Sequence, residues 1–178
     1  MPKYKSAEVG VQMPSDGIVE GYASTFDRTP DSYGDVIAKG AFARTLDEWR
    51  AKEGDGLSIP LLYGHNTDDP MHNIGRVTDA HEDERGLFVH AEFDADNELA
   101  QYARKLAAEG RLYQFSFAYS IRDAAEVQND GHYDYELRDL DLYEVSLVQI
   151  PANQHAVVTS IKGGGAGLKS GRRNSKAD

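Results

Sequence analysis

Residues Tyr113 to Ile121 read Y-Q-F-S-F-A-Y-S-I, an alternation that predicts a β-strand with two unlike faces. The face expected to point into a core is aromatic and aliphatic: Phe115, Phe117, Tyr119 and Ile121. The opposite face carries small and polar residues: Ser116, Ala118 and Ser120. A substrate backbone can approach such a face closely. A strand serine is nevertheless most often an ordinary outward-facing residue, so Ser116 gains meaning only from its partners.

Two other strand-like runs each bring a reactive side chain. Leu61 to Asn66 reads L-L-Y-G-H-N and ends beside His65, and Leu142 to Val148 reads L-Y-E-V-S-L-V and contains Glu144. In the second run the residues expected to point inward are Tyr143, Val145 and Leu147. A histidine can take a proton from a serine hydroxyl, and a carboxylate can orient that histidine. These residue types therefore suggest a serine hydrolase if the three side chains meet.

The alternatives for these residues are less specific. Glu144 can be an exposed strand glutamate, and His65 a surface histidine. A zinc site is the main rival, with His65 and His72 joined by Asp68 or Asp69. The chain lacks a His-Glu-x-x-His pattern, so the sequence supports a zinc site only weakly.

The order of predicted elements indicates a mainly β domain with flanking helices. Residues 1–16 are expected to be a polar lead-in, 17–162 the folded domain and 163–178 a disordered tail rich in Gly, Lys, Arg and Ser. Helical spacing is present in 40–52 and in 96–109, where Asp96 is the expected N-cap and Tyr102 an expected core-facing residue. The strand-like ranges are 18–26, 57–63, 73–80, 86–93, 113–121, 132–137 and 142–150. Short strands with hairpin links predict an antiparallel barrel or sandwich.

Composition excludes several classes of function. The chain has 178 residues and a formal net charge of -11, and its few basic clusters lie near the end, which argues against nucleic-acid binding. It has no cysteine, so a thiolate metal site and a cysteine nucleophile are excluded. No apolar run reaches the roughly 18 residues of a membrane span. We expect a soluble intracellular protein with no cofactor and no membrane contact.

Several short fragments occur in an order that resembles the tailed-phage prohead serine proteases of the HK97 type. The resemblance covers about residues 17 to 160 of this chain. The fragments are G-Y-A-S-T-F (21–26), G-D-V-I (34–37), G-A-F-x-x-T-L (40–46), G-H (64–65), I-G-R-V (74–77), G-L-x-V (86–89), F-S-F-A-Y (115–119) and E-V-S-L-V (144–148). Ala118 departs from the family pattern, which often has glycine there.

The resemblance implies a fold, a site and a substrate. The fold would be the Greek-key-like barrel of herpesvirus assemblins, and His65, Ser116 and Glu144 would be base, nucleophile and orienting carboxylate. The substrate would be the scaffold segment of the major capsid protein, cleaved inside the procapsid in the host cytoplasm, with autocatalytic trimming of the tail and a homodimer as further expectations. Backbone N–H groups near 151–153, or an ordered water, are candidate oxyanion donors. The alternative is a non-catalytic capsid-assembly module that only binds scaffold.

Overall fold

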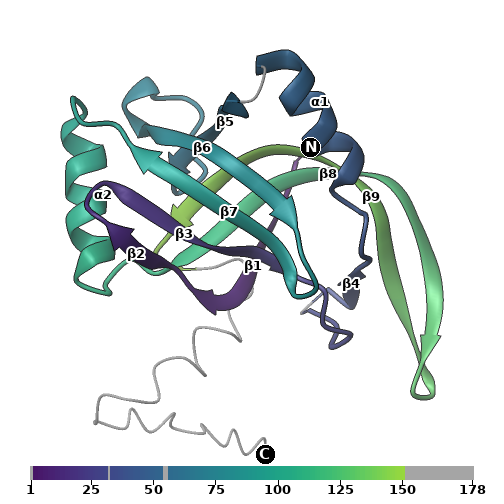
Figure 1. Ribbon diagram of the computed structural model, residues 1–178. Helices are drawn as coiled ribbons and strands as arrows, with labels where there is room; N and C mark the ends of the chain where they lie inside the picture. The colour runs from purple at the N-terminus through teal and green to yellow at the C-terminus, as the bar shows by residue number, and fades with distance from the viewer. Residues whose placement is uncertain (1, 32, 54–55, 151–178) are drawn as a thin grey trace, which may run out of the picture.

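The fold is built on one nine-stranded sheet that curls into a half-barrel (Figure 1). The structure, a computed structural model, describes residues 2–31, 33–53 and 56–150. The sheet order is β1-β8-β9-β5-β6-β7-β3-β2, with β4 beside β9. The strands are β1 (Lys3–Gly10), β2 (Gln12–Ser15), β3 (Ile18–Thr25), β4 (Asp35–Ile37), β5 (Ile59–Tyr63), β6 (Asn73–Glu82), β7 (Gly86–Phe93), β8 (Gln114–Asn129) and β9 (His132–Val148).

The concave side of the sheet holds the hydrophobic core. In β7, Leu87, Val89 and Ala91 are fully buried while the residues between them are partly exposed, as the alternation predicts. Strands β1 and β3 also touch across the opening although they are not sheet neighbours. Strands β6 and β7 pair antiparallel, which confirms the predicted hairpin.

Two α-helices and a short 3-10 turn, η2 (Pro70–His72), accompany the sheet in the part of the chain that the structure describes. Helix α1 (Ala43–Glu53) buries Leu46 and packs Trp49 against the core, as its spacing predicts. Helix α2 (Glu98–Ala108) is capped by Asn97, whose side chain accepts from the N–H groups of Leu99 and Ala100. The expected cap, Asp96, is wrong by one residue, since Asn and Asp serve equally well at that position. Tyr102, expected in the core, is 51% exposed.

The expectation of a mainly β fold with helices is confirmed, but the sheet is mixed rather than antiparallel. Strand β9 pairs in parallel with β5, through Leu61–Val145 and Leu62–Ser146, and in parallel with β4. The expectation of a wholly antiparallel sheet is therefore wrong. Parallel pairing joins segments more than eighty residues apart, and nothing in the local pattern of either segment specifies it.

The N-terminal segment differs from the expected lead-in because β1 and β2 form the two ends of the sheet order. The polar sequence conceals β1 because its inward residues are Lys5 and Ala7, and Lys5 is buried through ion pairs to Asp31 and Asp35. Strand β1 pairs antiparallel with β8, with Ser6 opposite Ser116. The expected tail, 163–178, lies outside the described residues.

Strands β8 and β9 form one long, curved ribbon where three shorter strands were expected. Their outer part continues beyond the other strands as a two-stranded arm (Figure 1). The ladder shifts register between Ala118–Glu144 and Tyr119–Leu142, so that Tyr143 is the extra residue of a β-bulge. A bulge reverses the alternation beyond it. As a result Leu142 is buried and Tyr143 is 45% exposed, which corrects the expectation that Tyr143 points inward.

Candidate active site

Sheet register places the candidate residues side by side. Ser116 on β8 lies opposite Ser146 on β9, and Ser146 lies beside Leu62 on β5. The row runs across three strands, and Glu144 is two residues from Ser146 on the same strand. His65 follows β5 directly, so the parallel β5–β9 pairing brings His65 to the row. The half-barrel thus assembles the site from three separate stretches of the chain.

A left-handed turn aims the imidazole of His65 back over the sheet. Gly64 and His65 both have positive φ, at 63° and 58°. This conformation costs a non-glycine residue roughly 1–2 kcal/mol, so it needs support from the surroundings. The support comes from β9: the Gly64 N–H donates to the Leu147 carbonyl at 3.0 Å, and the His65 N–H donates to Ser146 Oγ at 3.0 Å.

The structure brings all three predicted residues together. His65 Nε2 is 2.7 Å from Ser116 Oγ, and His65 Nδ1 contacts Glu144 Oε1. An ionised carboxylate only accepts hydrogen bonds, so Nδ1 carries the hydrogen and Nε2 is available to the serine hydroxyl. Ser116 is fully buried and Glu144 is 4% exposed. In this arrangement the imidazole can take the hydroxyl proton, and the carboxylate can stabilise the imidazolium that results.

Ser146 contacts two of these residues, and the sequence reasoning missed it. Its hydroxyl donates to Glu144 Oε2 at 2.7 Å and accepts the His65 N–H, so one side chain ties the carboxylate to the turn that carries the imidazole. A buried carboxylate requires such partners because it has left water. The signal in the sequence is the i, i+2 spacing of Glu144 and Ser146, which places both on one strand face when no bulge intervenes.

Ser146→Ala is expected to lower kcat about 10- to 100-fold and to change KM little, because loss of a hydrogen bond to a charged group typically costs about 1.5–3 kcal/mol. The measurement is steady-state cleavage of a peptide substrate by the variant and the wild type. Ser58→Ala, a change outside this network, is the matched control. Wild-type kcat in Ser146→Ala would contradict a positioning role.

Strand β1 covers the serine. Ser116 Oγ donates to the Lys5 carbonyl at 2.9 Å, and the Tyr4 ring packs on the His65 ring with a centroid separation of 4.2 Å. A hydroxyl has one hydrogen, so Ser116 directs it either to the Lys5 carbonyl or to His65 Nε2. A main-chain carbonyl therefore already lies against the candidate nucleophile.

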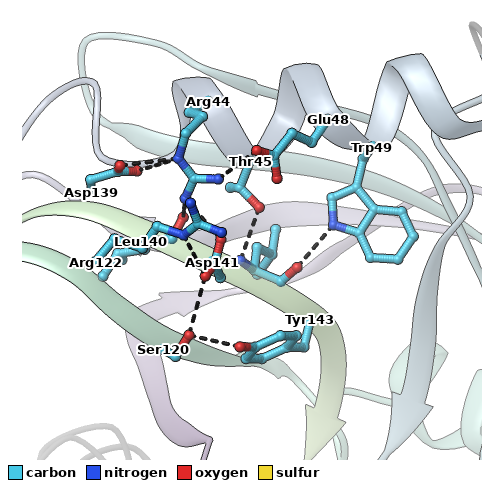
Figure 2. A network of polar contacts seen from close by, with 11 residues as sticks. Arg44, Thr45, Glu48, Trp49, Ser120, Arg122, Asp139, Leu140, Asp141 and Tyr143 are labelled. Carbon is cyan, nitrogen blue, oxygen red and sulfur yellow. Dashed lines mark hydrogen bonds and ion pairs between the residues drawn. The ribbon is translucent and has the colours of Figure 1, made fainter.

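Helix α1 holds the bulge next to Glu144. The Leu142 N–H donates to Thr45 Oγ at 3.0 Å, and the Trp49 indole N–H donates to the Leu142 carbonyl at 2.9 Å (Figure 2). These two side chains satisfy backbone groups that the bulge removes from the sheet ladder. Around them Arg44 joins Asp139 and Asp141, and hydrogen bonds from Arg122 and Arg44 lower the pKa of Asp141 (Figure 2).

Thr45→Val is expected to lower the free energy of unfolding by about 1–3 kcal/mol, because it leaves the buried Leu142 N–H without an acceptor while conserving shape. Urea unfolding followed by circular dichroism measures the loss. Thr78→Val is the control, since the hydrogen bond from the Thr78 hydroxyl to the His90 carbonyl is long, at 3.4 Å. Equal stability of the two variants would contradict the role of Thr45.

The zinc alternative is not what the geometry favours. The ring of His65 is committed to Ser116 and Glu144, while His72 lies against Asp69. Across 2–31, 33–53 and 56–150 no three His, Asp or Glu side chains are grouped so as to hold a metal ion. The candidate oxyanion donors near 151–153 lie outside the described residues.

A family model described as the caudovirus prohead serine protease matches residues 4–167. The chain belongs to this family. The match extends the resemblance in the sequence to the N-terminal strand as well.

In the part of the chain that the structure describes, no helix is long and apolar enough to cross a bilayer.

Three curated relatives have similar sequences. The prohead protease of Enterobacteria phage HK97 is 29% identical over 147 residues, which is 82% of this chain and 60% of the relative. The prohead protease of Escherichia phage T5 is 29% identical over 152 residues, 83% of this chain and 65% of the relative. The capsid polyprotein of Pseudomonas phage PAJU2 is 28% identical over 166 residues, 89% of this chain and 22% of the relative. The chain thus spans less than two thirds of the length of each.

A solved structure has the same fold. The capsid assembly protease of bacteriophage T4 superposes with a TM-score of 0.61 over 85% of this chain and 98% of that one. The sequences are 13% identical, so this likeness concerns the fold alone.

Proposed function

We propose that this chain is a serine endopeptidase that cuts the scaffold segment of a major capsid protein during phage prohead maturation. The observation that supports it most is the continuous contact from Ser116 Oγ to His65 Nε2, at 2.7 Å, and from His65 Nδ1 to Glu144. Membership of the prohead serine protease family and the capsid polyprotein relative support the substrate class.

The proposed chemistry is acyl transfer. His65 takes the proton of Ser116 as Oγ attacks the scissile carbonyl carbon, and then gives that proton to the leaving amine. The chain fragment left behind is an ester on Ser116. Water, deprotonated by His65, cleaves that ester and restores the serine. Glu144 holds the imidazole tautomer and stabilises each imidazolium that forms.

The place of action and the partners follow from that role. The enzyme would work inside the procapsid in the host cytoplasm, at the high local concentration that assembly provides. Trimming of its own tail, at Lys169-Ser170 or Arg172-Arg173, and self-association into a dimer stay predictions from the sequence.

Co-expression with the major capsid protein of the same phage or prophage tests the proposal. Intact-mass analysis of the capsid protein, made with and without this chain, is expected to show a shortened form only when the chain is present. The new terminus gives the cleaved bond. An unchanged capsid-protein mass in assembled particles would overturn the proposal and favour a non-catalytic assembly module.

A further inference from the structure

Strand β1 crosses the candidate site as an extended peptide lying against the serine. It pairs antiparallel with β8, with Lys5 opposite Phe117 and Ser6 opposite Ser116. The Lys5 carbonyl is the one that Ser116 Oγ touches, at 2.9 Å. Alternate side chains point to opposite faces of a strand, so Tyr4 lies on His65 while Lys5 enters the body of the protein. Lys5 therefore stands where the residue whose carbonyl is attacked would stand.

The Lys5 side chain fills a pocket built for a cation. Its ammonium pairs with Asp31 and lies 3.0 Å from Asp35 Oδ2. The Tyr33 and Tyr119 ring centroids lie 5.3 and 5.8 Å from the same Nζ, within the distance at which aromatic faces attract a cation. Only 6% of the Lys5 side chain is exposed, so the two carboxylates and two rings replace the water around its charge.

The pocket is negatively charged, so the strand that pairs with β8 at this place must supply a cation to it. Without one, Asp31 and Asp35 would be two like charges in a poorly solvated space. Burial, with the nearby carboxylates of Asp35 and Asp31, raises the pKa of the Tyr119 phenol, which reports the same negative potential. An open volume of about 330 Å³ borders Lys5, Asp27, Asp31 and Asp35, which leaves room for the larger guanidinium of arginine.

We propose that a substrate strand takes the place of β1 beside β8, and that the Asp31–Asp35 pocket then selects lysine or arginine as the residue on the N-terminal side of the bond that Ser116 cleaves. A carboxylate in the corresponding pocket produces this preference in trypsin. Asp31 and Asp35 are then specificity-determining residues, and Tyr33, at the exposed mouth, and Tyr119 are the walls. The inference rests on the proposed function and adds the class of bond: a peptide bond following a basic residue.

The first test uses the wild-type chain alone. It is incubated with a proteome-derived peptide mixture, and the residue before each new C-terminus is read by mass spectrometry, with Ser116→Ala as the background. We expect Lys and Arg at that position at least about tenfold above their frequency in the mixture. Matched peptides that differ only in having Lys, Met or Glu there should be cleaved in the order Lys, Met, Glu, with at least a tenfold step from Lys to Met.

The second test changes the pocket. Asp35→Asn and Asp31→Asn are expected to lower the ratio of Lys to Met cleavage about tenfold, whereas Glu84→Gln, which removes an equal charge at an exposed site, should leave that ratio unchanged. The ratio is independent of how much of each variant folds. Ser116-dependent cuts without enrichment of Lys and Arg, or an unchanged ratio in both Asp variants, would overturn the pocket while leaving the protease intact. Absence of any Ser116-dependent cut would overturn the proposed function, and the pocket's role with it.

Discussion

Ser116→Ala is expected to lower the rate of capsid-protein cleavage by about 10⁶, because removal of the nucleophile from a serine protease costs that much in kcat. In co-expression the capsid protein should keep its full mass. The side chain is fully buried, so the loss cannot come from an altered surface. The reason is chemical: without Oγ no acyl-enzyme forms, and the base has no proton to take.

The control for Ser116→Ala is a second serine on the same strand. Ser120 donates to Asp141 and contacts the Tyr143 hydroxyl, with no contact to His65, so Ser120→Ala should cleave at nearly the wild-type rate. Ser116→Ala loses the single hydrogen bond that the hydroxyl donates, to the Lys5 carbonyl or to His65 Nε2, which typically contributes about 1 kcal/mol, so its unfolding transition should move only slightly. A folded Ser116→Ala protein that still shortens the capsid protein would remove Ser116 from the chemistry.

The local elements could be predicted because each depends on neighbours in the sequence. Burial of one face of an element leaves a periodic hydrophobic pattern in its own sequence. This pattern is the alternation in β7 and the spacing of Leu46 and Trp49 in α1. The same reasoning failed at Tyr143, because one inserted residue reverses the alternation of the strand. The bulge also depends on a hydrogen-bond acceptor and a donor from α1, Thr45 and Trp49, which the strand sequence does not reveal. The reasoning failed again at β1, where a buried lysine is stabilised by carboxylates about thirty residues away.

In the candidate site, too, the local features could be predicted and the long-range contacts could not. His65 was predicted from its place at a strand end and Ser116 from the small polar face of its strand. Glu144 was predicted because it is a carboxylate among apolar residues. Their meeting depends on the parallel pairing of β5 with β9, which has no local signature. Ser146 was missed for a related reason: a serine in a strand is common, and only its two simultaneous contacts, to Glu144 and to the turn at His65, distinguish it.

Glu144→Gln is expected to lower kcat by about 10⁴ with little change in KM, the loss seen when an amide replaces the carboxylate of such a triad. Glutamine has nearly the same shape, so the buried site should remain packed. It brings no negative charge, and its amide does not enforce the tautomer in which Nδ1 carries the hydrogen. The imidazolium would then form beside a neutral group in a poorly solvated position. Single-turnover cleavage of a peptide substrate measures the chemical step directly.

Glu136→Gln is the matched control, because Glu136 lies on the same strand and pairs with Arg28 and Arg138 away from the site. Wild-type kcat in Glu144→Gln would exclude the carboxylate from the mechanism. Comparison with Ser146→Ala separates charge from position. Ser146→Ala keeps the charge and loosens its placement, so a loss far smaller than that of Glu144→Gln would assign the main effect to the charge. Equal losses would mean that Glu144 acts through the geometry that Ser146 imposes on it.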